Sequence, residues 1–302
     1  MNVLVYSEDS ETAYQLLGKA RELSSDESSR VNVLCDEVSG DYFNYGADVV
    51  FKAELNVNNV EGCRDALVKA VELSEPGVIL IGATKLGKEL APRVAARIGA
   101  GCMTDCNDVY VENGKIVTER YTYGGSTISR EQSSKPAVVT VPPRTYEKLE
   151  TGNVDGEVVE LDFEAREPRV EVLERRDKPK SEADLENADI IISAGRGFRE
   201  KEDLKILEEL AEVLGAQMGC SRPISADLGW MDDWVGISGR KVKPSLYIAC
   251  GISGTIQHIA GIRDSKIIVA INKDEGAGIH GVSDYSIIGD IYEFLPALVK
   301  VL

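Results

Sequence analysis

The segment from Leu246 to Gly261 constrains the fold more than any other part of the chain. An apolar stretch at residues 246–249 leads into a turn with glycines at 251 and 254, and then into residues typical of a helix start. This order predicts a buried strand, a tight turn and the first turns of a helix. Such a turn directs main-chain N–H groups toward an anion, and its glycines let a phosphate approach closely. We expect His258 in the opening turn of the helix, beside any bound group.

Length and composition indicate two folded domains. The chain has 302 residues, of which 43% are hydrophobic, so it holds enough apolar material for two cores. Its formal net charge of −17 disfavours nucleic-acid binding, because following a phosphate backbone requires clustered Lys and Arg side chains. A solvated acidic surface is the ordinary interpretation of this charge, although it also suits recognition of basic partner surfaces.

The cysteines are dispersed along the chain, which predicts free thiols in a reducing compartment. None of the six belongs to a CxxC pair, and Cys102 and Cys106 have no His or further Cys nearby to complete a zinc site. The first residues enter a strand-like segment directly, and no apolar run approaches about 20 residues. We therefore expect a soluble, cytoplasmic protein with no export leader, no membrane insertion and no metal site.

Short apolar segments alternate with amphipathic segments in the first hundred residues, which predicts a mostly parallel sheet with helices between its strands. Residues 109–111 and 116–120 then flank Asn113-Gly114, a pair typical of a tight hairpin. Another apolar run, at 137–141, ends at Pro142-Pro143. The expected strands of the alternating region lie at 3–6, 31–34, 49–51 and 78–81, and the expected helices at 11–23, 62–73 and 85–98.

The middle of the chain is acidic and mixed, and we place the domain boundary there. Brief apolar alternation occurs at 158–163 and 170–173, before the charged segment 175–180. The predicted division gives an N-terminal α/β domain with added β-strands at 1–185 and a C-terminal α/β domain at 186–302.

The second domain is expected to hold a parallel sheet. A buried strand at 190–194 leads into Gly195-Arg196-Gly197, and leucines at helical spacing predict a helix over 202–214. Further buried strands are expected at 246–249 and 267–271. Ligands of open α/β sheets bind outside the carboxyl ends of the strands, so these turns are candidates for a site. By itself the turn at 195–197 is a weak signal, because it lacks the third glycine of the dinucleotide fingerprint.

Five motifs follow one another in an order and spacing similar to those of a known family. They are Gly195-Arg196-Gly197, Cys220-Ser221-Arg222, the segment 235–239, the glycine-rich string with Asn272 after it, and Ser283-Asp284-Tyr285. Residues 190–295 thereby resemble the flavin-binding half of the electron transfer flavoprotein alpha subunit. The N-terminal half is similar through residues 82–84 and 89–100. The resemblance implies a nucleotide-hydrolase-like N-terminal domain that serves as scaffold and docking surface, and a Rossmann-like C-terminal domain that binds FAD.

The resemblance also implies a set of FAD contacts. Arg196 would contact the flavin nucleotide, where the planar, permanently charged guanidinium suits phosphate. Arg222 would lie over the isoalloxazine ring and raise its potential by stabilising the negative charge gained on reduction. The amides of residues 253–255 would reach the pyrophosphate, and Asn272 and Asp284 the ribityl or adenosine side. The implied positions are Arg196, Ser221, Arg222, Val235, Gly236, Ile237, Ser238, Ser253, Gly254, Thr255, Ile256, Gln257, His258, Asn272, Asp284 and Tyr285.

Three of these positions require separate interpretation. The family generally has Gln where Ile237 stands, so Ile237 offers only its backbone groups, whereas Ser238 keeps a hydroxyl that can donate to the central ring. A lone His at a helix start is more often a cap or core residue, but the preceding glycine-rich motif favours a functional His258. The helix dipole opposes its protonation and a reduced flavin favours it. A neutral His258 that donates one hydrogen bond to the pyrimidine end of the flavin is compatible with both effects.

The implied function is that of the alpha subunit of a heterodimer, in which a beta subunit completes the cleft over FAD. Such a protein carries electrons between a dehydrogenase and an acceptor such as a quinone oxidoreductase, as in fatty acid β-oxidation, and converts no substrate of its own. One alternative is a subunit of an electron-bifurcating flavoprotein that oxidises NADH. An alternative from another class is a non-redox nucleotide-binding module. No catalytic triad or acid/base carboxylate pair is recognisable, which favours chemistry by a bound cofactor.

Overall fold

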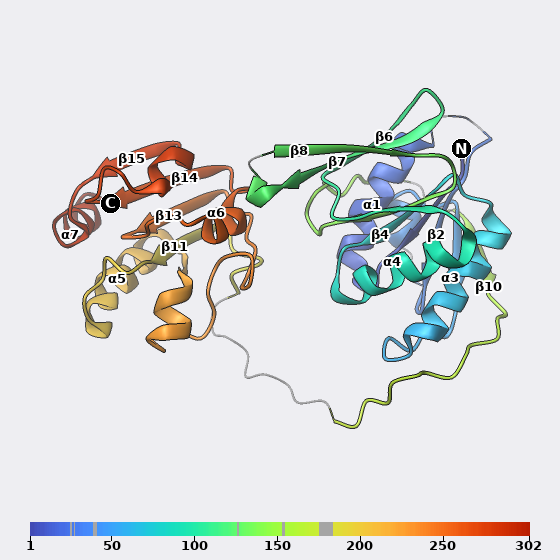
Figure 1. Cartoon of the computed structure of the whole chain (residues 1–302), viewed down its shortest axis with the longest axis horizontal. Helices are drawn as coiled ribbons and strands as arrows, with labels where there is room; N and C mark the ends of the chain where they lie inside the picture. The colour runs from blue at the N-terminus through green and yellow to red at the C-terminus, as the bar shows by residue number, and fades with distance from the viewer. Residues whose placement is uncertain (25, 27, 39–40, 126, 153–154, 175–183) are drawn as a thin grey trace. The chain divides into compact units, whose positions relative to one another are not determined.

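The structure is a computed structural model, and it describes residues 1–24, 26, 28–38, 41–125, 127–152, 155–174 and 184–302. The chain forms two compact units, Met1–Arg175 and Arg176–Leu302 (Figure 1). Each unit is built on its own parallel sheet, so the mixed α/β architecture is as predicted. The boundary expected at 185/186 stays a prediction, and the charged segment 175–180 lies outside the described residues.

A seven-stranded sheet forms the centre of the first unit, in the order β10-β3-β2-β1-β4-β9-β5, and every neighbouring pair is parallel. Successive side chains of its middle strands enter different cores: Val3 and Val5 pack on one face, and Leu4 and Tyr6 on the other. The strands are β1 (Val3–Tyr6), β2 (Val31–Cys35), β3 (Val49–Lys52), β4 (Val78–Gly82), β5 (Gly101–Met103), β9 (Ala137–Val141) and β10 (Glu157–Glu160).

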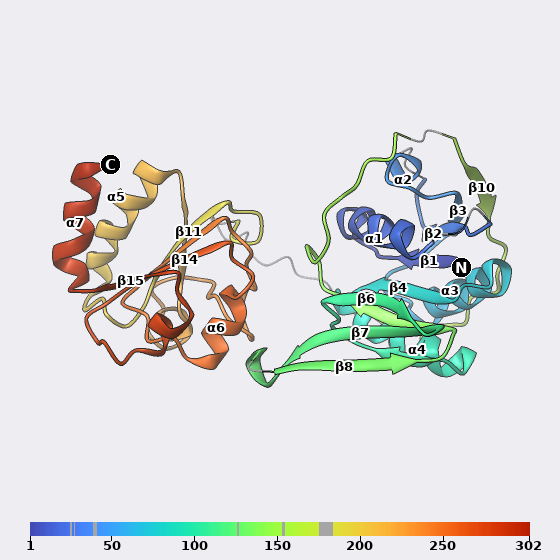
Figure 2. The same cartoon turned by 90° about the horizontal axis from the view of Figure 1, so that it is seen from above.

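Helices cover both faces of this sheet. Helix α1 (Ser10–Leu23) packs on one face, and α3 (Val60–Ser74) and α4 (Lys85–Ile98) pack on the other (Figure 2). A short helix, α2 (Asp41–Asn44), adds Tyr42 and Phe43 to the core beside α1. The helices at 11–23, 62–73 and 85–98 are therefore confirmed, the last with the predicted bounds.

The added strands of the first unit form a separate antiparallel sheet of β6 (Asp108–Glu112), β7 (Lys115–Thr122) and β8 (Thr127–Ser133). The turn between β6 and β7 is the predicted one, with φ of 50° at Asn113 and 77° at Gly114. A 3₁₀ turn, η1 (Tyr123–Gly125), follows β7. Strand β8 was not predicted, because its alternating residues are polar and mostly exposed rather than apolar on one face.

The second unit contains a five-stranded parallel sheet in the order β12-β11-β13-β14-β15. Helices α5 (Leu204–Leu214) and α7 (Ile291–Val301) lie side by side on one face, and α6 (Ile256–Ile262) lies on the other (Figure 2). The strands are β11 (Ile190–Ala194), β12 (Gln217–Cys220), β13 (Leu246–Cys250), β14 (Ile267–Asn272) and β15 (Tyr285–Ile288). Single turns at η2 (Lys201–Asp203), η3 (Pro223–Asp227) and η4 (Gly278–Val282) complete the unit.

Several details differ from the sequence-based expectation, and strands β5, β12 and β15 were not predicted. The alternation at 158–163 gives only the short edge strand β10, and residues 170–173 form no strand, because Val170 and Leu173 are exposed and have no core to face. The helix expected at 202–214 begins as the 3₁₀ turn η2 and becomes α-helical at Leu204. Helix α7 was not anticipated. Among the described residues, no helix is both long and apolar enough to cross a membrane.

Candidate functional site

The candidate site lies in the second unit, at the carboxyl edge of its sheet. With the strands numbered along the chain, their order is 2-1-3-4-5, and the connections diverge between β11 and β13. Open α/β sheets bind ligands at such a switch point. The turns that follow β11, β12 and β13, together with Asn272 at the end of β14, all lie at this edge. The structure therefore places three of the five motifs at the carboxyl ends of strands.

The turns after β11 and β13 pack directly against each other through glycines. The N–H of Gly195 donates to the Cys250 carbonyl at 2.8 Å, and the N–H of Gly197 donates to the Gly251 carbonyl at 3.0 Å. A Cβ atom at position 195 would lie 2.2 Å from the Gly251 oxygen, which is much closer than a non-bonded contact allows. Glycine is therefore required here by packing, and the side chain of Arg196 is left exposed at the edge.

The residues between β13 and α6 present unpaired amides. Gly254 has a φ of 76°, a conformation that favours glycine, and a Cβ there would lie 2.1 Å from the Ile279 nitrogen. The N–H of Ile279 donates to the Ser253 carbonyl at 3.2 Å, which fixes the turn on η4. Within the described residues, the N–H groups of Ser253, Gly254 and Thr255 have no acceptor. Successive free amides of this kind form a concave donor set for an anion.

A second guanidinium follows the neighbouring strand β12. The N–H of Ser221 donates to the Ala194 carbonyl at 2.8 Å, which continues the pairing of β12 with β11 by one residue. Ser221 is buried at this point. The next residue, Arg222, is exposed and immediately precedes the turn η3. Arg196 and Arg222 thus extend from the ends of two adjacent parallel strands. This part of the edge carries two permanent positive charges.

The loop 235–239 is held against the start of α6. The N–H of Val235 donates to the Cys220 carbonyl at 2.8 Å, and the N–H of Ile237 donates to the Gln257 carbonyl at 2.9 Å. Gly261 allows close contact, because a Cβ at that position would lie 2.5 Å from the Gly236 Cα. The Ile237 side chain is 50% exposed, and Ile256, which precedes Gln257 in the chain, is 59% exposed. Each offers exposed apolar surface in a segment that borders the carboxyl edge.

Ser238 is exposed in the same loop, and its hydroxyl accepts a hydrogen bond from the indole N–H of Trp234 at 3.3 Å. The hydroxyl hydrogen is therefore still available to a ligand. The structure leaves the side chain of Gln257 exposed as well. These positions agree with a surface that a flat ring could cover.

His258 lies in the opening turn of α6, as predicted, but its ring does not face solvent. The residue is only 4% exposed. Its Nδ1 lies 3.1 Å from the Val235 carbonyl oxygen, and its Nε2 lies 3.0 Å from the Tyr247 hydroxyl. Burial lowers the pKa of His258 to about 4, and the bond to the Val235 carbonyl offsets part of that effect. The ring is neutral, as expected, but the structure differs from the expectation that it offers an N–H to a ligand, because both nitrogens are occupied within the protein.

The remaining predicted residues lie farther along the sheet. Asn272 donates from Nδ2 to the Ile252 carbonyl at 2.8 Å and so ties the ends of β13 and β14 together. Asp284 lies at the amino end of β14, where its carboxylate accepts from the Ile268 N–H at 2.8 Å. Tyr285 is 63% exposed on the edge strand β15. The structure therefore does not bring Asp284 and Tyr285 to the carboxyl edge, and their contacts with FAD stay a prediction.

A small cavity of about 40 Å³ opens at the same edge, on the side of α7. Arg199, Lys273 and Tyr292 line it together with glycines of the turns, and sequence reasoning singled out none of the three. The Arg199 guanidinium lies 4.9 Å from the centre of the Tyr292 ring, and the main-chain N–H of Arg199 donates to the Tyr292 hydroxyl at 2.7 Å. The space has room for a few water molecules but cannot hold a ring system.

In the first unit, the equivalent switch point lies between β1 and β4 and is acidic. Glu8 and Asp9 follow β1, and the Thr84 hydroxyl donates to Glu8 Oε2 at 2.9 Å. Asp9 accepts from the N–H of Thr12, and Thr84 accepts from the N–H of Gly87. The helix caps use amides that a phosphate would need, and the carboxylates repel it. This arrangement supports a scaffold role for the first unit.

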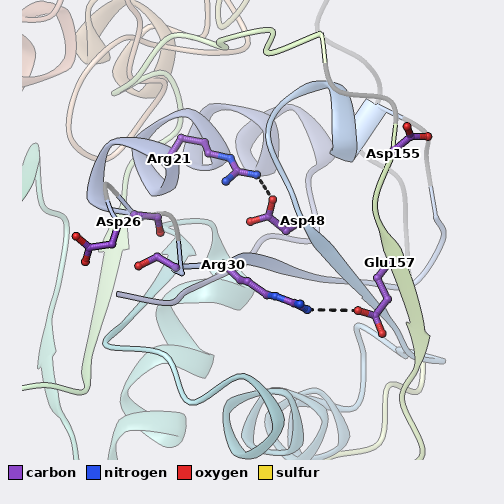
Figure 3. A pocket seen from close by; sticks show the side chains of 8 residues that line it. Arg21, Asp26, Arg30, Asp48, Asp155 and Glu157 are labelled. Carbon is purple, nitrogen blue, oxygen red and sulfur yellow. Dashed lines mark hydrogen bonds and ion pairs between the residues drawn. The ribbon is translucent and has the colours of Figure 1, made fainter.

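The first unit also has an open cavity of about 530 Å³ at the amino edge of its sheet (Figure 3). Its arginines already have partners: Arg21 is paired with Asp48, and Arg30 donates to Glu157 at 3.4 Å. The cavity is exposed and lies opposite the edge where parallel sheets bind ligands. We therefore do not assign it as the functional site. Among the described residues, no group of His, Cys, Asp and Glu has the arrangement of a metal site.

Comparison with known proteins identifies both units. The model of the electron transfer flavoprotein domain matches residues 3–166, and that of the electron transfer flavoprotein FAD-binding domain matches residues 184–263. The second match includes the predicted positions from Arg196 to His258, and leaves Asn272, Asp284 and Tyr285 outside it.

Relatives match almost the whole chain. The protein FixB of Clostridium saccharobutylicum is 40% identical over 301 residues, covering 94% of this chain and 90% of its own. The electron transfer flavoprotein subunit alpha of Bacillus subtilis is 36% identical and covers 95% and 91%. The lactate dehydrogenase (NAD(+),ferredoxin) subunit LctC of Acetobacterium woodii is 36% identical and covers 96% of this chain but 72% of its own.

Proposed function

Because this chain belongs to the electron transfer flavoprotein alpha-subunit family, we propose that it binds one FAD across the carboxyl edge of β11, β12 and β13 and carries electrons as one chain of a heterodimer. The family's FAD-binding domain occupies residues 184–263. Membership in this family also removes the basis for the non-redox nucleotide-binding alternative.

The convergence of three chemically different surfaces at one edge carries this proposal. Unpaired amides at Ser253–Thr255 suit a pyrophosphate, two exposed guanidiniums suit negative charge, and the apolar surface of Ile237 and Ile256 suits a flat ring. FAD combines these features in one molecule: a negatively charged pyrophosphate and a flat aromatic ring. The glycines at 195 and 251 let the two turns that border this edge pack backbone against backbone.

The protein's own contribution is to hold the cofactor and tune its electronics. FAD, when bound, supplies the one- and two-electron chemistry. We propose that Arg196 and the free amides bind the pyrophosphate region, and that Arg222 places a fixed cation near the ring. The hydroxyl hydrogen of Ser238 is available for a polar edge of the ring. No further acid or base is needed, because an electron carrier converts no substrate of its own.

A partner chain is part of the proposal. Within this unit the proposed FAD surface is an exposed edge, so a beta subunit that covers it would exclude water and strengthen the electrostatic contacts. Alone, the chain is expected to retain FAD weakly. Both chains should be co-expressed, purified and assayed for flavin by absorbance after denaturation. About one FAD per heterodimer supports the proposal, whereas a colourless complex that stays colourless with added FAD contradicts it.

A second function in the same family is favoured by one relative. LctC of Acetobacterium woodii is a subunit of lactate dehydrogenase (NAD(+),ferredoxin), a name that includes both a nicotinamide and a ferredoxin. A chain that serves in such a complex would work beside a second flavin in the partner, with NADH as the electron source. Two FAD per heterodimer would support this alternative, and one would support the simple carrier.

The cell compartment and redox partners complete the proposal. All six cysteines are free, and burial raises the pKa of the Cys63 and Cys106 thiols to about 11, so these two are inert structural groups. We infer a reducing, cytoplasmic environment from this pattern. The electron donor would be a dehydrogenase and the acceptor a quinone oxidoreductase or similar protein.

A further inference from the structure

The side chain of Trp234 contacts the loop that borders the proposed flavin surface. Its indole N–H donates to the Ser238 hydroxyl oxygen at 3.3 Å, and its ring packs against the core of the second unit. We propose that Trp234 is a positioning residue that turns the hydroxyl hydrogen of Ser238 toward the bound flavin and so makes this hydroxyl a hydrogen-bond donor to the ring. The proposal rests on the proposed function, because it requires a flavin beside the loop 235–239.

The chemistry of the two groups determines the direction of this hydrogen bond. An indole nitrogen can only donate, whereas a serine hydroxyl has one hydrogen and two lone pairs. The Ser238 oxygen therefore accepts on the side that faces Trp234, and its hydrogen must point elsewhere. Among the residues that the structure describes, no acceptor is bonded to that hydrogen, and Ser238 is exposed. The hydrogen is thus left for a bound ligand.

The backbone of the loop holds the indole beside Ser238. A Cβ atom at position 239 would lie 2.1 Å from the Trp234 carbonyl oxygen and 2.7 Å from its indole nitrogen, so the ring lies directly on the Gly239 backbone. The Trp234 carbonyl accepts from the Arg240 N–H at 2.8 Å, and the Arg240 carbonyl accepts from the Gly236 N–H at 3.0 Å. These bonds close the loop and bring residues 234 and 238 together.

Ion pairs hold the base of the same loop. The Arg240 guanidinium donates to the carboxylate of Asp233, the residue before Trp234, at 3.1 and 3.2 Å. It also donates to Glu186 at 2.9 Å. The two ends of the segment 233–240 are therefore joined through both main chain and side chains. The Ser238 donor is in place before FAD binds, which lowers the ordering cost of binding.

A hydroxyl with a preset hydrogen affects a flavin differently from a freely rotating one. In water an exposed hydroxyl exchanges between donor and acceptor states, but a ring that covers Ser238 excludes water and becomes its partner. Reduction adds negative charge to the ring, so a fixed donor does not bind the oxidised and reduced forms equally. We expect the donor to change the ratio of the two affinities roughly tenfold, which is about 30 mV for a two-electron couple.

The indole signal of Trp234 in nuclear magnetic resonance tests the hydrogen bond. Trp230 and Trp234 are the only tryptophans of the chain, so ¹⁵N labelling of its indoles, in a flavin-free heterodimer with an unlabelled partner, gives two signals that Trp230→Phe assigns. We expect Ser238→Ala to shift the Trp234 signal and to speed its exchange with water, and to leave the Trp230 signal in place. A Trp234 signal that does not respond to Ser238→Ala would overturn the proposal.

Midpoint potentials of the FAD-loaded complex test the link to the flavin. The wild type, Trp234→Phe, Ser238→Ala and the double variant form a double-mutant cycle. We expect Trp234→Phe to shift the potential in the same direction as Ser238→Ala, and to add no shift in the Ser238→Ala background, because the tryptophan acts through that hydroxyl. Trp230→Phe is the matched control, since it makes the same substitution on the other tryptophan that packs on this core, and it should keep the wild-type potential.

The outcomes separate this proposal from the proposed function. Equal shifts from Trp234→Phe with and without the Ser238 hydroxyl would mean that the tryptophan acts by packing alone, which refutes the positioning role. An unchanged potential in Trp234→Phe refutes it as well, while FAD binding and the proposed function stand. A complex that binds no FAD removes the proposed function, and this inference with it. If Trp234→Phe does not fold, the indole signal decides, since Ser238→Ala and Trp230→Phe both keep Trp234.

Discussion

The second unit should lose stability on mild acidification because of one buried side chain. Burial lowers the pKa of His258 from 6.5 to about 4, so the folded protein binds this proton less tightly than the unfolded chain does. Where the unfolded state binds more protons, the free energy of unfolding falls as pH falls. The loss begins near pH 6.5, where the unfolded histidine titrates, and is complete below pH 4.

The size of the effect follows from the two pKa values. At pH 5 the unfolded histidine is almost fully protonated, whereas about a tenth of the folded His258 is. The corresponding loss in unfolding free energy between pH 7 and pH 5 is about 2 kcal/mol. The full loss at lower pH approaches about 3 kcal/mol. Such a change is large against the total stability of an ordinary domain.

Tryptophan fluorescence offers a selective assay. Both tryptophans of the chain, Trp230 and Trp234, pack against the core of the second unit, so their emission follows the unfolding of that unit alone. Urea unfolding of the wild type and of His258→Gln should be compared at pH 7 and pH 5. Carboxylates affect both proteins alike and cancel in the comparison. The variant should lack the 2 kcal/mol dependence, and an equal pH dependence in both proteins would refute the reasoning.

Three further changes have defined outcomes. Gly195→Ala should destabilise the second unit by more than about 2 kcal/mol, as followed by urea unfolding, because the new Cβ meets backbone, while Gly281→Ala, which meets open space, should not. Arg222→Ala should lower the midpoint potential of the bound flavin by tens of millivolts in a redox titration, on the order expected for loss of a nearby cation. The control Lys205→Ala on α5 keeps the Arg222 cation and should leave the potential unchanged. An unchanged or higher potential in Arg222→Ala argues against the role of Arg222. Thr84→Ala should cost the first unit about 1 kcal/mol by loss of the α4 cap, measured by circular dichroism, and Thr84→Ser should restore it.

The parallel sheets could be predicted from sequence because their strands are buried on both faces. Segments such as 3–6, 78–81 and 190–194 are continuous apolar runs, which only such a sheet accommodates in a chain of this kind. Strand β8 could not be found in this way, because its own residues are mostly polar and exposed. Helix α7 has a clear apolar face, so the sequence itself carries the periodicity that predicts this helix.

The site was predictable in its composition but not in its geometry. Glycines at 195, 251 and 254 indicate close backbone approach, and the structure places each of them against another main-chain segment. The environment of His258 was not predictable, because its partners come from β13 and from a loop more than twenty residues away. Sequence spacing does not encode such a contact. For the same reason, Arg199 and Lys273 could not be linked, since they meet only when β11 and β14 end at one edge.

Hydrogen–deuterium exchange of the complex with and without FAD tests the central claim most directly. The account predicts that FAD slows exchange in the turns after β11, β12 and β13 and in the loop 235–239, because these segments bind the cofactor. Exchange near Glu8 and Thr84 in the first unit should not change, since carboxylates and helix caps occupy that edge. Protection confined to the first unit, or none in the second, would contradict the assignment of the FAD site.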